Sequence, residues 1–304
     1  MYRSRCPFKN YKTEPMMKPL VSVVMITYGH EKYIEESING VLSQVLDAEI
    51  ELLISDDCSP DNTEIIVKKI IDTHPNGSWI KYIRHTENKG AIPNFAWTIS
   101  QSTGKYVALC EGDDYWTDPL KLKKQVDFLE RNEDYILCFH KVKILKTDGV
   151  IVEDFITKIP ENYELRKTLA ENSNYIHTPS VLFRNIKLNE LNSLEFQNTP
   201  IGDYFLYLIL TKYGKIGYLE DEMCVYRYGV GIFSSLDEFK QLKINSLLYA
   251  NLYSLEKDPN IKAIFYKNLY NIISQIEHQY IVNAKLLATR RHKMIEKIYK
   301  KLKK

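Results

Sequence analysis

Short, nearly continuous hydrophobic runs recur along the first half of the chain. The first of them, Leu20–Thr27, is rich in valine and has almost no charged position, which is typical of a strand buried on both faces of a parallel sheet. Such strands are predicted at Leu20–Thr27, Glu49–Ile54, Trp79–Arg84, Lys105–Cys110 and Tyr135–Leu145.

Segments with helical spacing separate these runs. In Glu31–Leu46 the apolar residues return every three or four positions, as on one face of a helix. Further helices are predicted at Asp61–Asp72, Pro93–Gln101 and Pro119–Glu130. Strands that alternate with helices of this length predict an α/β fold, with a mostly parallel, twisted sheet flanked by helices.

The alternation weakens beyond residue 150, and the chain becomes helical from about Leu236. Between these points we expect helices at Tyr163–Glu171 and Gly202–Tyr213, and strands at His177–Arg184, Lys215–Leu219 and Met223–Tyr228. The C-terminal segment carries two apolar stripes, made of Ile261, Ile264, Phe265, Leu269, Ile272, Ile276 and Tyr280, and of Leu287, Met294, Ile295, Ile298 and Leu302. We therefore expect an N-terminal extension (1–18), an α/β domain (19–235) and a C-terminal helical region with a basic tail (236–304).

Composition excludes several classes of protein. The 304 residues are 44% hydrophobic and 26% charged, which argues against disorder and against a fibrous repeat. No run of 18 apolar residues occurs, and residues 1–18 lack the apolar core of a secretory signal. The five cysteines are widely spaced and form no CxxC pair, which disfavours a disulfide framework or a Cys-rich zinc site and favours a cytoplasmic location.

Charge is distributed unevenly along the chain. Residues 285–304 hold nine basic residues against one acidic residue, a net charge of +8, whereas residues 1–284 hold 32 basic and 38 acidic residues. The acidic body does not resemble a nucleic-acid binder. The tail suits either an anionic membrane surface or the solvated end of a helix, and both interpretations remain open.

Two acidic pairs directly follow predicted strands. Asp56-Asp57 comes after the second strand, and Asp113-Asp114 comes after the fourth, within the segment Glu111–Trp116. Ligands of parallel α/β sheets bind at the carboxyl ends of the strands, and carboxylates there suit Mg²⁺ or Mn²⁺. The alternative is that these acids cap helices.

The order of these motifs along the chain is more specific than any one of them. Val21–Tyr28 is followed by Glu51–Ser59, then by Glu87–Gly90, and then by Gly104–Tyr106 leading to Glu111–Asp114. Over about residues 18–235 the series resembles glycosyltransferase family 2, the inverting sugar-nucleotide transferases of GT-A fold. The resemblance implies a GT-A-like domain that binds a nucleotide-sugar donor and a divalent cation, Mn²⁺ or Mg²⁺.

The resemblance also implies roles for single residues. Thr27, Tyr28 and Asp57 match positions that hold the nucleobase and ribose, and Asp113 lies near the ribose. Asp114 matches the metal ligand, and only two acids stand at this motif unless Glu111 contributes. Asp203 in Ile201-Gly202-Asp203 matches the catalytic base, and Arg227 precedes a loop that closes over the donor. Trp116 and His177 are weaker candidates for acceptor contacts, and core packing is the alternative for each.

The function implied is an inverting transfer of a sugar from a UDP-linked donor to a hydroxyl of a glycan, lipid-linked or protein-linked acceptor in bacterial surface glycan synthesis. The site of action would be the cytoplasm or the inner face of the membrane. One alternative is a donor-binding scaffold or regulatory protein without turnover. A nucleotidyltransferase is disfavoured, because the segment Thr27–Glu31 lacks the glycine-rich signature of that class.

Overall fold

The computed structural model describes residues 18–231 and 236–302. Beyond residue 282, side chains are described only at Lys285 and Lys293. Nearly all of the predicted N-terminal extension lies outside the described residues.

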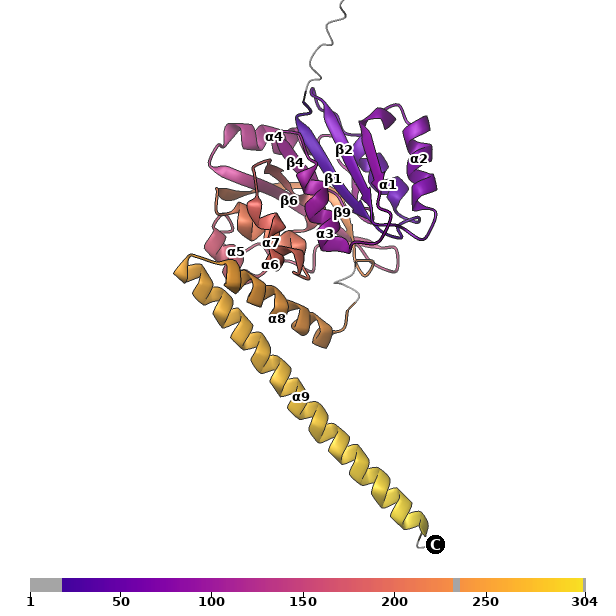
Figure 1. Ribbon diagram of the computed structural model, residues 1–304, viewed down its shortest axis with the longest axis vertical. Coiled ribbons are helices and arrows are strands. Elements are labelled where there is room, and N and C mark those ends of the chain that lie inside the picture. Colours follow the sequence, from indigo (N-terminus) through magenta and orange to yellow (C-terminus); the bar gives the residue numbers. More distant parts are fainter. Residues whose placement is uncertain (1–17, 232–235, 303–304) are drawn as a thin grey trace, which may run out of the picture.

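One mixed sheet organises the α/β domain (Figure 1). Its strands are β1 Val21–Thr27, β2 Ile50–Asp56, β3 Ile80–Arg84, β4 Tyr106–Leu109, β5 Tyr115–Trp116, β6 Tyr135–Leu145, β7 Ile151–Glu153, β8 Leu182–Arg184 and β9 Lys215–Arg227. Among the described residues the strand order is β3-β2-β1-β4-β8-β6-β9-β5, with β7 paired to β6. The ladder is parallel from β3 to β4 and between β6 and β9.

The helices are α1 Ile34–Leu42, α2 Thr63–Thr73, α3 Ala91–Ser100, α4 Lys121–Arg131, α5 Arg166–Asn172, α6 Leu194–Gln197, α7 Gly202–Leu210, α8 Glu238–Leu255 and α9 Pro259–Leu302. Short 3-10 turns lie at Gly77–Trp79, Thr178–Ser180 and Asn189–Asn192. In Figure 1, α9 runs far beyond the body of the molecule. None of the helices among the described residues combines the length and the hydrophobicity that crossing a membrane requires.

The first strand shows why its sequence is almost wholly apolar. Val21, Val23 and Met25 belong to the core shared with α1 and α2, whereas Val24 belongs to the core on the opposite face, shared with α3 and α7. Successive side chains of a strand point to opposite faces, so a strand covered on both faces needs apolar residues at every position.

The long strands point the same way, as predicted, but the sheet is not uniformly parallel. The short β8 lies between β4 and β6 and is antiparallel to both, so β6 keeps the direction of β1–β4. The predicted strand His177–Arg184 is shorter than expected, because the segment Thr178–Ser180 forms a 3-10 turn. The strands β5 and β7 were not predicted.

The two strands predicted after residue 214 are one strand in the structure. In β9, Leu219 pairs with His140 and Glu222 pairs with Lys141, so residues 220 and 221 are skipped in the ladder. The skipped residues are polar, and they interrupt the apolar pattern in the sequence, which is why two strands were predicted. The predicted C-terminal helical region is likewise interrupted, since the side chain of Glu256 accepts the backbone N–H groups of Lys257 and Asp258 between α8 and α9.

Candidate active site

The carboxyl ends of β1, β2 and β4 meet at one edge of the sheet. Thr27 at the end of β1 pairs with Asp56 at the end of β2. After β4, the backbone N–H of Gly112 still bonds to the carbonyl of Ile26 at 3.0 Å, so the acidic loop leaves the sheet beside β1. Both acidic pairs of the sequence therefore lie at this edge.

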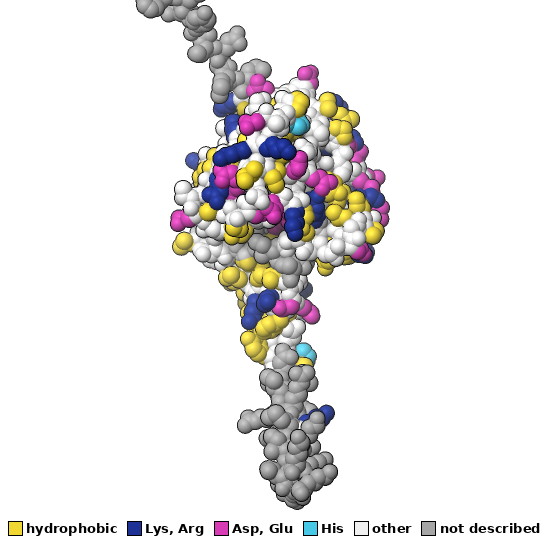
Figure 2. All heavy atoms as spheres, turned by 90° about the vertical axis from the view of Figure 1, so that its right-hand side faces the viewer, with side chains coloured by type: hydrophobic (Ala, Val, Ile, Leu, Met, Phe, Trp, Pro, Cys, Tyr) yellow, Lys and Arg dark blue, Asp and Glu magenta, His cyan; other side chains and the backbone are white. Residues whose placement is uncertain are grey.

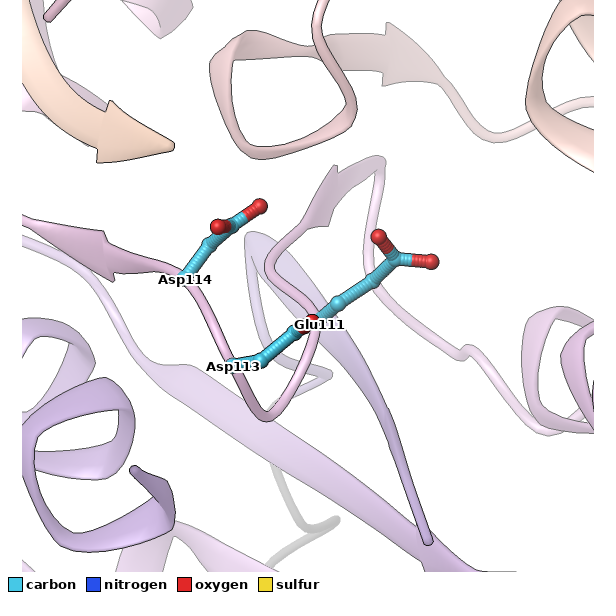
Figure 3. Close-up of side chains that lie close together, drawn as sticks. All are labelled: Glu111, Asp113 and Asp114. Atoms are coloured by element: carbon cyan, nitrogen blue, oxygen red, sulfur yellow. The ribbon is translucent and has the colours of Figure 1, made fainter. Parts of the chain in front are cut away.

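Three carboxylates of the acidic loop lie close together (Figure 3). Glu111, Asp113 and Asp114 each offer one oxygen, and these oxygens lie within 4.8 Å of one another. Oδ1 of Asp114 accepts the backbone N–H of Arg227 at 2.8 Å, whereas its Oδ2 is buried without a hydrogen-bond partner. A buried carboxylate oxygen without a donor, beside two further acids, fits a hard divalent cation. Glu111 thus supplies the third acid that the sequence left open.

The electrostatics of the loop support the same assignment. Burial, followed by the charges of Asp113 and Asp203, raises the pKa of Glu111 to about 8. Burial and the charges of Asp113 and Glu111 raise the pKa of Asp114 well above its usual value, although Arg227 opposes this. Like charges held together in a buried place are stabilised by a positive charge among them.

Gly112 allows the loop to approach β1. A Cβ atom there would lie 2.8 Å from both Nδ1 of His30 and Oγ1 of Thr27. These two atoms are 3.2 Å apart, so the strand end and the acidic loop are packed together without room for a side chain. Glycine is therefore required between Glu111 and Asp113.

The raised pKa of Glu111 predicts how stability depends on pH without metal. Its ordinary pKa is 4.5 and its pKa in the folded protein is about 8, so the folded state binds the proton more tightly. The free energy of unfolding should therefore fall as pH rises from about 4.5 to 8. Differential scanning fluorimetry in EDTA should show this slope, and Glu111→Gln should flatten it. The control Glu171→Gln, at an exposed acid of α5, should leave the slope unchanged; an unchanged slope in Glu111→Gln would contradict the assignment.

Asp57 is held in place by the loop before α3. Its Oδ1 accepts the backbone N–H of Lys89 at 2.7 Å, and its Oδ2 accepts that of Gly90 at 2.9 Å. The side chain is buried, with 3% of its surface exposed. A donor base bonded to Asp57 would therefore also contact this loop.

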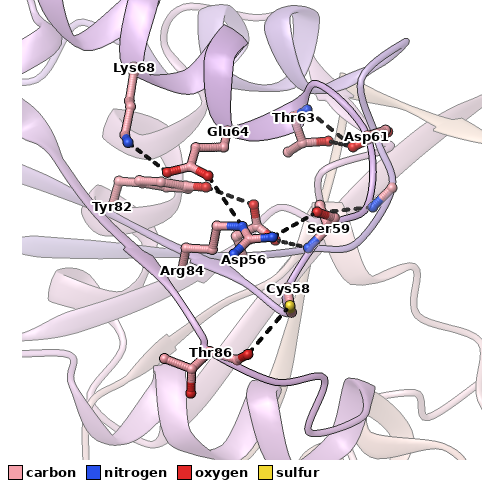
Figure 4. A network of polar contacts seen from close by, with 11 residues as sticks. Asp56, Cys58, Ser59, Asp61, Thr63, Glu64, Lys68, Tyr82, Arg84 and Thr86 are labelled. Atoms are coloured by element: carbon pink, nitrogen blue, oxygen red, sulfur yellow. Dashed lines mark hydrogen bonds and ion pairs between the residues drawn. The ribbon is translucent and has the colours of Figure 1, made fainter.

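A polar network fixes the turn from Asp56 to Ser59 (Figure 4). Asp56 accepts the backbone N–H of Ser59 and the hydroxyl of Tyr82, each at 2.7 Å. Arg84 donates to the carbonyl of Ser59 at 3.1 Å and pairs with Glu64 of α2. Of the first acidic pair, Asp56 thus has a structural role, and Asp57 faces the loop at Lys89–Gly90.

Arg227 joins the end of β9 to the acidic loop. Its guanidinium donates to the carbonyl of Asp113 and pairs with Glu36 of α1. The rings of Tyr33 and Tyr115 lie 5.0 and 4.6 Å from it. The two-residue strand β5 creates this arrangement, because it pairs Tyr115 with Val225 and so brings the acidic loop against β9. Sequence reasoning missed Glu36 and Tyr33, for which the sequence offers no signal.

Asp203 lies in the first turn of α7, with its carboxylate bonded on both oxygens. Oδ1 accepts the backbone N–H of Tyr204 at 2.7 Å, and Oδ2 accepts from Asn174 Nδ2 at 3.0 Å and Thr178 Oγ1 at 3.2 Å. Burial raises its pKa, although these three hydrogen bonds oppose the rise. Burial, followed by the charges of Asp203 and Glu111, raises the pKa of Tyr207, which follows Asp203 by one turn. Asp203 and Glu111 therefore lie near the same buried region, beside Tyr207.

The remaining predicted residues are placed differently. Tyr28 is 49% exposed at the end of β1. His177 bonds Asp154 through Nε2 at 2.9 Å and lies against the ring of Tyr226, next to Thr178. Trp116 is 3% exposed, donates its indole N–H to the carbonyl of Pro179 and lies 4.0 Å from the ammonium of Lys121. These contacts give Trp116 a packing role, which is the alternative that the sequence left open.

Comparison with known sequences finds relatives over most of the chain. Residues 22–190 match the family model Glycosyl transferase family 2. An uncharacterized glycosyltransferase of Methanocaldococcus jannaschii is 30% identical over 263 residues, which cover 84% of each chain. An uncharacterized protein of Mycobacterium bovis is 35% identical over 216 residues, 71% of this chain and 61% of that protein. This chain thus spans less than two thirds of the length of that relative. The Escherichia coli enzyme UDP-Glc:alpha-D-GlcNAc-diphosphoundecaprenol beta-1,3-glucosyltransferase WfgD is 29% identical, covering 74% and 83% of the two chains.

Solved structures share the fold at lower identity. Residues 1–349 of Staphylococcus aureus TarS, in complex with UDP-GlcNAc, match with a TM-score of 0.58 and 21% identity, covering 84% of this chain and 72% of that fragment. The mannosyltransferase PcManGT of Pyrobaculum calidifontis, in complex with GDP-Man and Mn²⁺, matches with a TM-score of 0.60 and 18% identity, covering 91% and 80%.

Proposed function

Because this chain belongs to glycosyltransferase family 2, we propose that it transfers a sugar from a UDP-linked donor to an acceptor hydroxyl with inversion at the anomeric carbon. The fold is the GT-A fold expected from the sequence, with C-terminal helices added to it. We assign catalysis to residues 19–235 and a separate role to residues 236–304. The observation that carries the proposal is the cluster of Glu111, Asp113 and Asp114, together with the buried oxygen of Asp114 that has no hydrogen-bond partner.

The donor half of the proposed site lies at the ends of β1 and β2. Thr27, Tyr28 and Asp57 would hold the base and ribose, with Asp113 and Arg227 nearer the ribose and the diphosphate. The exposed ring of Tyr28 suits stacking on a base, and Asp57 suits a hydrogen bond to it. Two similar proteins support UDP as the donor nucleotide: TarS was solved in complex with UDP-GlcNAc, and the name of the Escherichia coli enzyme gives UDP-Glc as its donor. PcManGT was solved with GDP-Man, and for this reason the donor screen below includes GDP.

The acidic loop would hold the divalent cation, Mn²⁺ or Mg²⁺, through Asp114 together with Glu111 and Asp113. When bound, the cation neutralises the charge that develops on the departing nucleoside diphosphate. PcManGT was solved with Mn²⁺, which supports the choice of metal. The backbone N–H of Arg227 orients Asp114, since it bonds to Oδ1 and leaves Oδ2 without a hydrogen-bond partner.

Asp203 would be the general base. Asn174 and Thr178 hold its Oδ2, and burial raises its pKa towards the range in which a carboxylate accepts a proton effectively. Removal of the acceptor proton on the face opposite the leaving group gives a direct displacement and an inverted product. His177 lies next to Thr178 and is our candidate for contacting the acceptor.

The acceptor would be a glycan or a lipid-linked or protein-linked glycoconjugate used in surface glycan synthesis. The name of the Escherichia coli relative includes a diphosphoundecaprenol-linked sugar, and that of a Bacillus subtilis relative includes teichuronic acid biosynthesis. We propose action in the cytoplasm, at the inner face of the membrane, where such lipid-linked sugars are built. Nucleic acid has no role in this scheme.

A donor screen tests the proposal. The protein with Mn²⁺ would be titrated with UDP, GDP and dTDP by calorimetry. Nucleotide sugars with each of these three nucleotides would then be assayed for turnover. We expect UDP to bind most tightly, and Asp57→Ala to weaken its binding by roughly 1.5–3 kcal/mol because a charged hydrogen bond is lost. Asp72→Ala, at the far end of α2, is the control and should bind UDP as the wild type does. Nucleotide binding without turnover of any sugar would favour the non-catalytic scaffold instead.

A further inference from the structure

Helix α9 exposes a stripe of large apolar side chains, which the exposed Glu277 interrupts. Tyr266, Tyr270, Ile273, Tyr280 and Ile281, which we call the α9 stripe, are 59, 62, 43, 56 and 54% exposed. At 3.6 residues per turn these five positions fall within about 100° of the helix circumference. Figure 2 shows hydrophobic side chains gathered where the helix leaves the body.

The α9 stripe is not the face that packs on the body. That face contains Ile261 and Phe265, which are 5% and 0% exposed, with Leu269 and Ile272 partly buried beside them. Its centre lies roughly a third of a turn away from the stripe. The fold therefore needs the first face for its core, whereas the stripe contributes only the contacts of Tyr266 and Tyr280 with α8.

The sequence continues the stripe towards the C-terminus. Leu287, Ile295, Ile298 and Leu302 fall at positions on the same side of the helix. Among the basic residues from Lys285 to Lys301, all but Arg291 fall at positions on the remaining circumference. Apolar positions on one side and basic positions on the other make an amphipathic cationic helix.

The distribution of charge along α9 indicates what kind of partner this surface binds. Helices that pair with a second copy usually carry both signs of charge beside the apolar seam, so that the two copies attract. Residues 285–304 have a net charge of +8, which repels an identical segment and attracts an anionic surface. We propose that α9 lies along an anionic lipid surface, with the α9 stripe among the acyl chains and the basic residues at the headgroups. The proposal does not depend on sugar transfer, because membrane binding needs neither donor nor acceptor.

Vesicle flotation with the full chain tests this proposal. The vesicles are phosphatidylcholine alone, or an equal mixture of phosphatidylcholine and phosphatidylglycerol. The stripe variant is Tyr270→Gln/Ile273→Gln/Ile281→Gln, which avoids Tyr266 and Tyr280 because their rings also contact α8. The matched control is Asn271→Gln/Ser274→Gln/His278→Gln, at exposed positions of the same helix outside the stripe. Circular dichroism and UDP binding confirm that both variants remain folded.

We expect the wild type to float with the anionic vesicles only, and less so as salt is raised. The stripe variant should bind them about tenfold or more weakly, and the control should stay within about twofold of the wild type. Equal binding by the two variants would overturn the role of the stripe. If instead the wild type does not bind vesicles but forms a dimer, and the stripe variant stays monomeric, the stripe is the binding surface for a second copy of the chain.

Discussion

Asp203→Asn should lower the rate of sugar transfer by roughly 10²–10⁴-fold while donor binding and Mn²⁺ binding are retained. Asparagine has nearly the same shape as aspartate but cannot take up the acceptor proton. Its carbonyl oxygen can still accept from Asn174 and Thr178 at the position of Oδ2. The loss should therefore appear in kcat rather than in the affinity for UDP, and single-turnover transfer with calorimetry on the same sample separates the two.

The competing explanation for Asp203 is that it only stabilises the start of α7. Loss of an acidic charge from the first turn of a helix lowers the free energy of unfolding by about 0.3–1 kcal/mol and leaves the chemistry intact. The matched control is Asp237→Asn, because Asp237 caps α8 by accepting the backbone N–H of Lys240 at 2.9 Å. If both variants melt early and transfer sugar at the wild-type rate, Asp203 only stabilises the first turn of α7 and the base lies elsewhere.

The sequence predicted those parts of the fold that depend on local pattern. β1 and β2 are within two residues of the predicted strands, since burial on both faces leaves a continuous apolar run. Asp57 and the acidic loop could be placed at one sheet edge, because parallel strands bring their carboxyl ends together.

Features that depend on long-range pairing were not predictable in the same way. The strand β5 has only two residues, too few for any periodicity, yet its pairing with Val225 brings Arg227 to Asp114. The side chains that donate hydrogen bonds to Asp203 are those of Asn174 and Thr178. Both residues precede Asp203 by more than twenty positions, and neither belongs to a recognisable motif. The sequence could have identified Tyr207 as a neighbour of Asp203, because residues four positions apart lie on the same face of a helix.

The apolar pattern of α9 illustrates a different limit. Its first stripe in the sequence mixes Phe265, which is fully buried, with Tyr280, which is 56% exposed. A periodic pattern shows that a helix has an apolar side but not what covers that side. Only the packing of α9 against α8 and α5 separates the buried face from the exposed one.

Asp114→Asn should reduce metal-dependent transfer by at least about 10³-fold, the equivalent of roughly 4 kcal/mol in the activation free energy. Oδ1 of Asp114 is already occupied by the N–H of Arg227, and an asparagine oxygen can keep this bond. The change is then confined to the unpartnered Oδ2, which becomes an amide that neither binds a cation well nor carries charge. The same variant should lose the rise in melting temperature that Mn²⁺ produces in the wild type.

Without metal, the same substitution should have the opposite effect on stability. The pKa of Asp114 is raised by burial and by Asp113 and Glu111, so its ionised form destabilises the folded protein at pH values above its ordinary pKa. Asparagine removes that charge, and its amide can donate to the neighbouring carboxylates. In EDTA at pH 8 we therefore expect Asp114→Asn to melt at or above the temperature of the wild type, although it is inactive with Mn²⁺. Asp148→Asn, an exposed acid in the turn between β6 and β7, should change neither quantity by much. A variant that melts early in EDTA would instead make Asp114 a structural residue, and its inactivity would then say nothing about a metal.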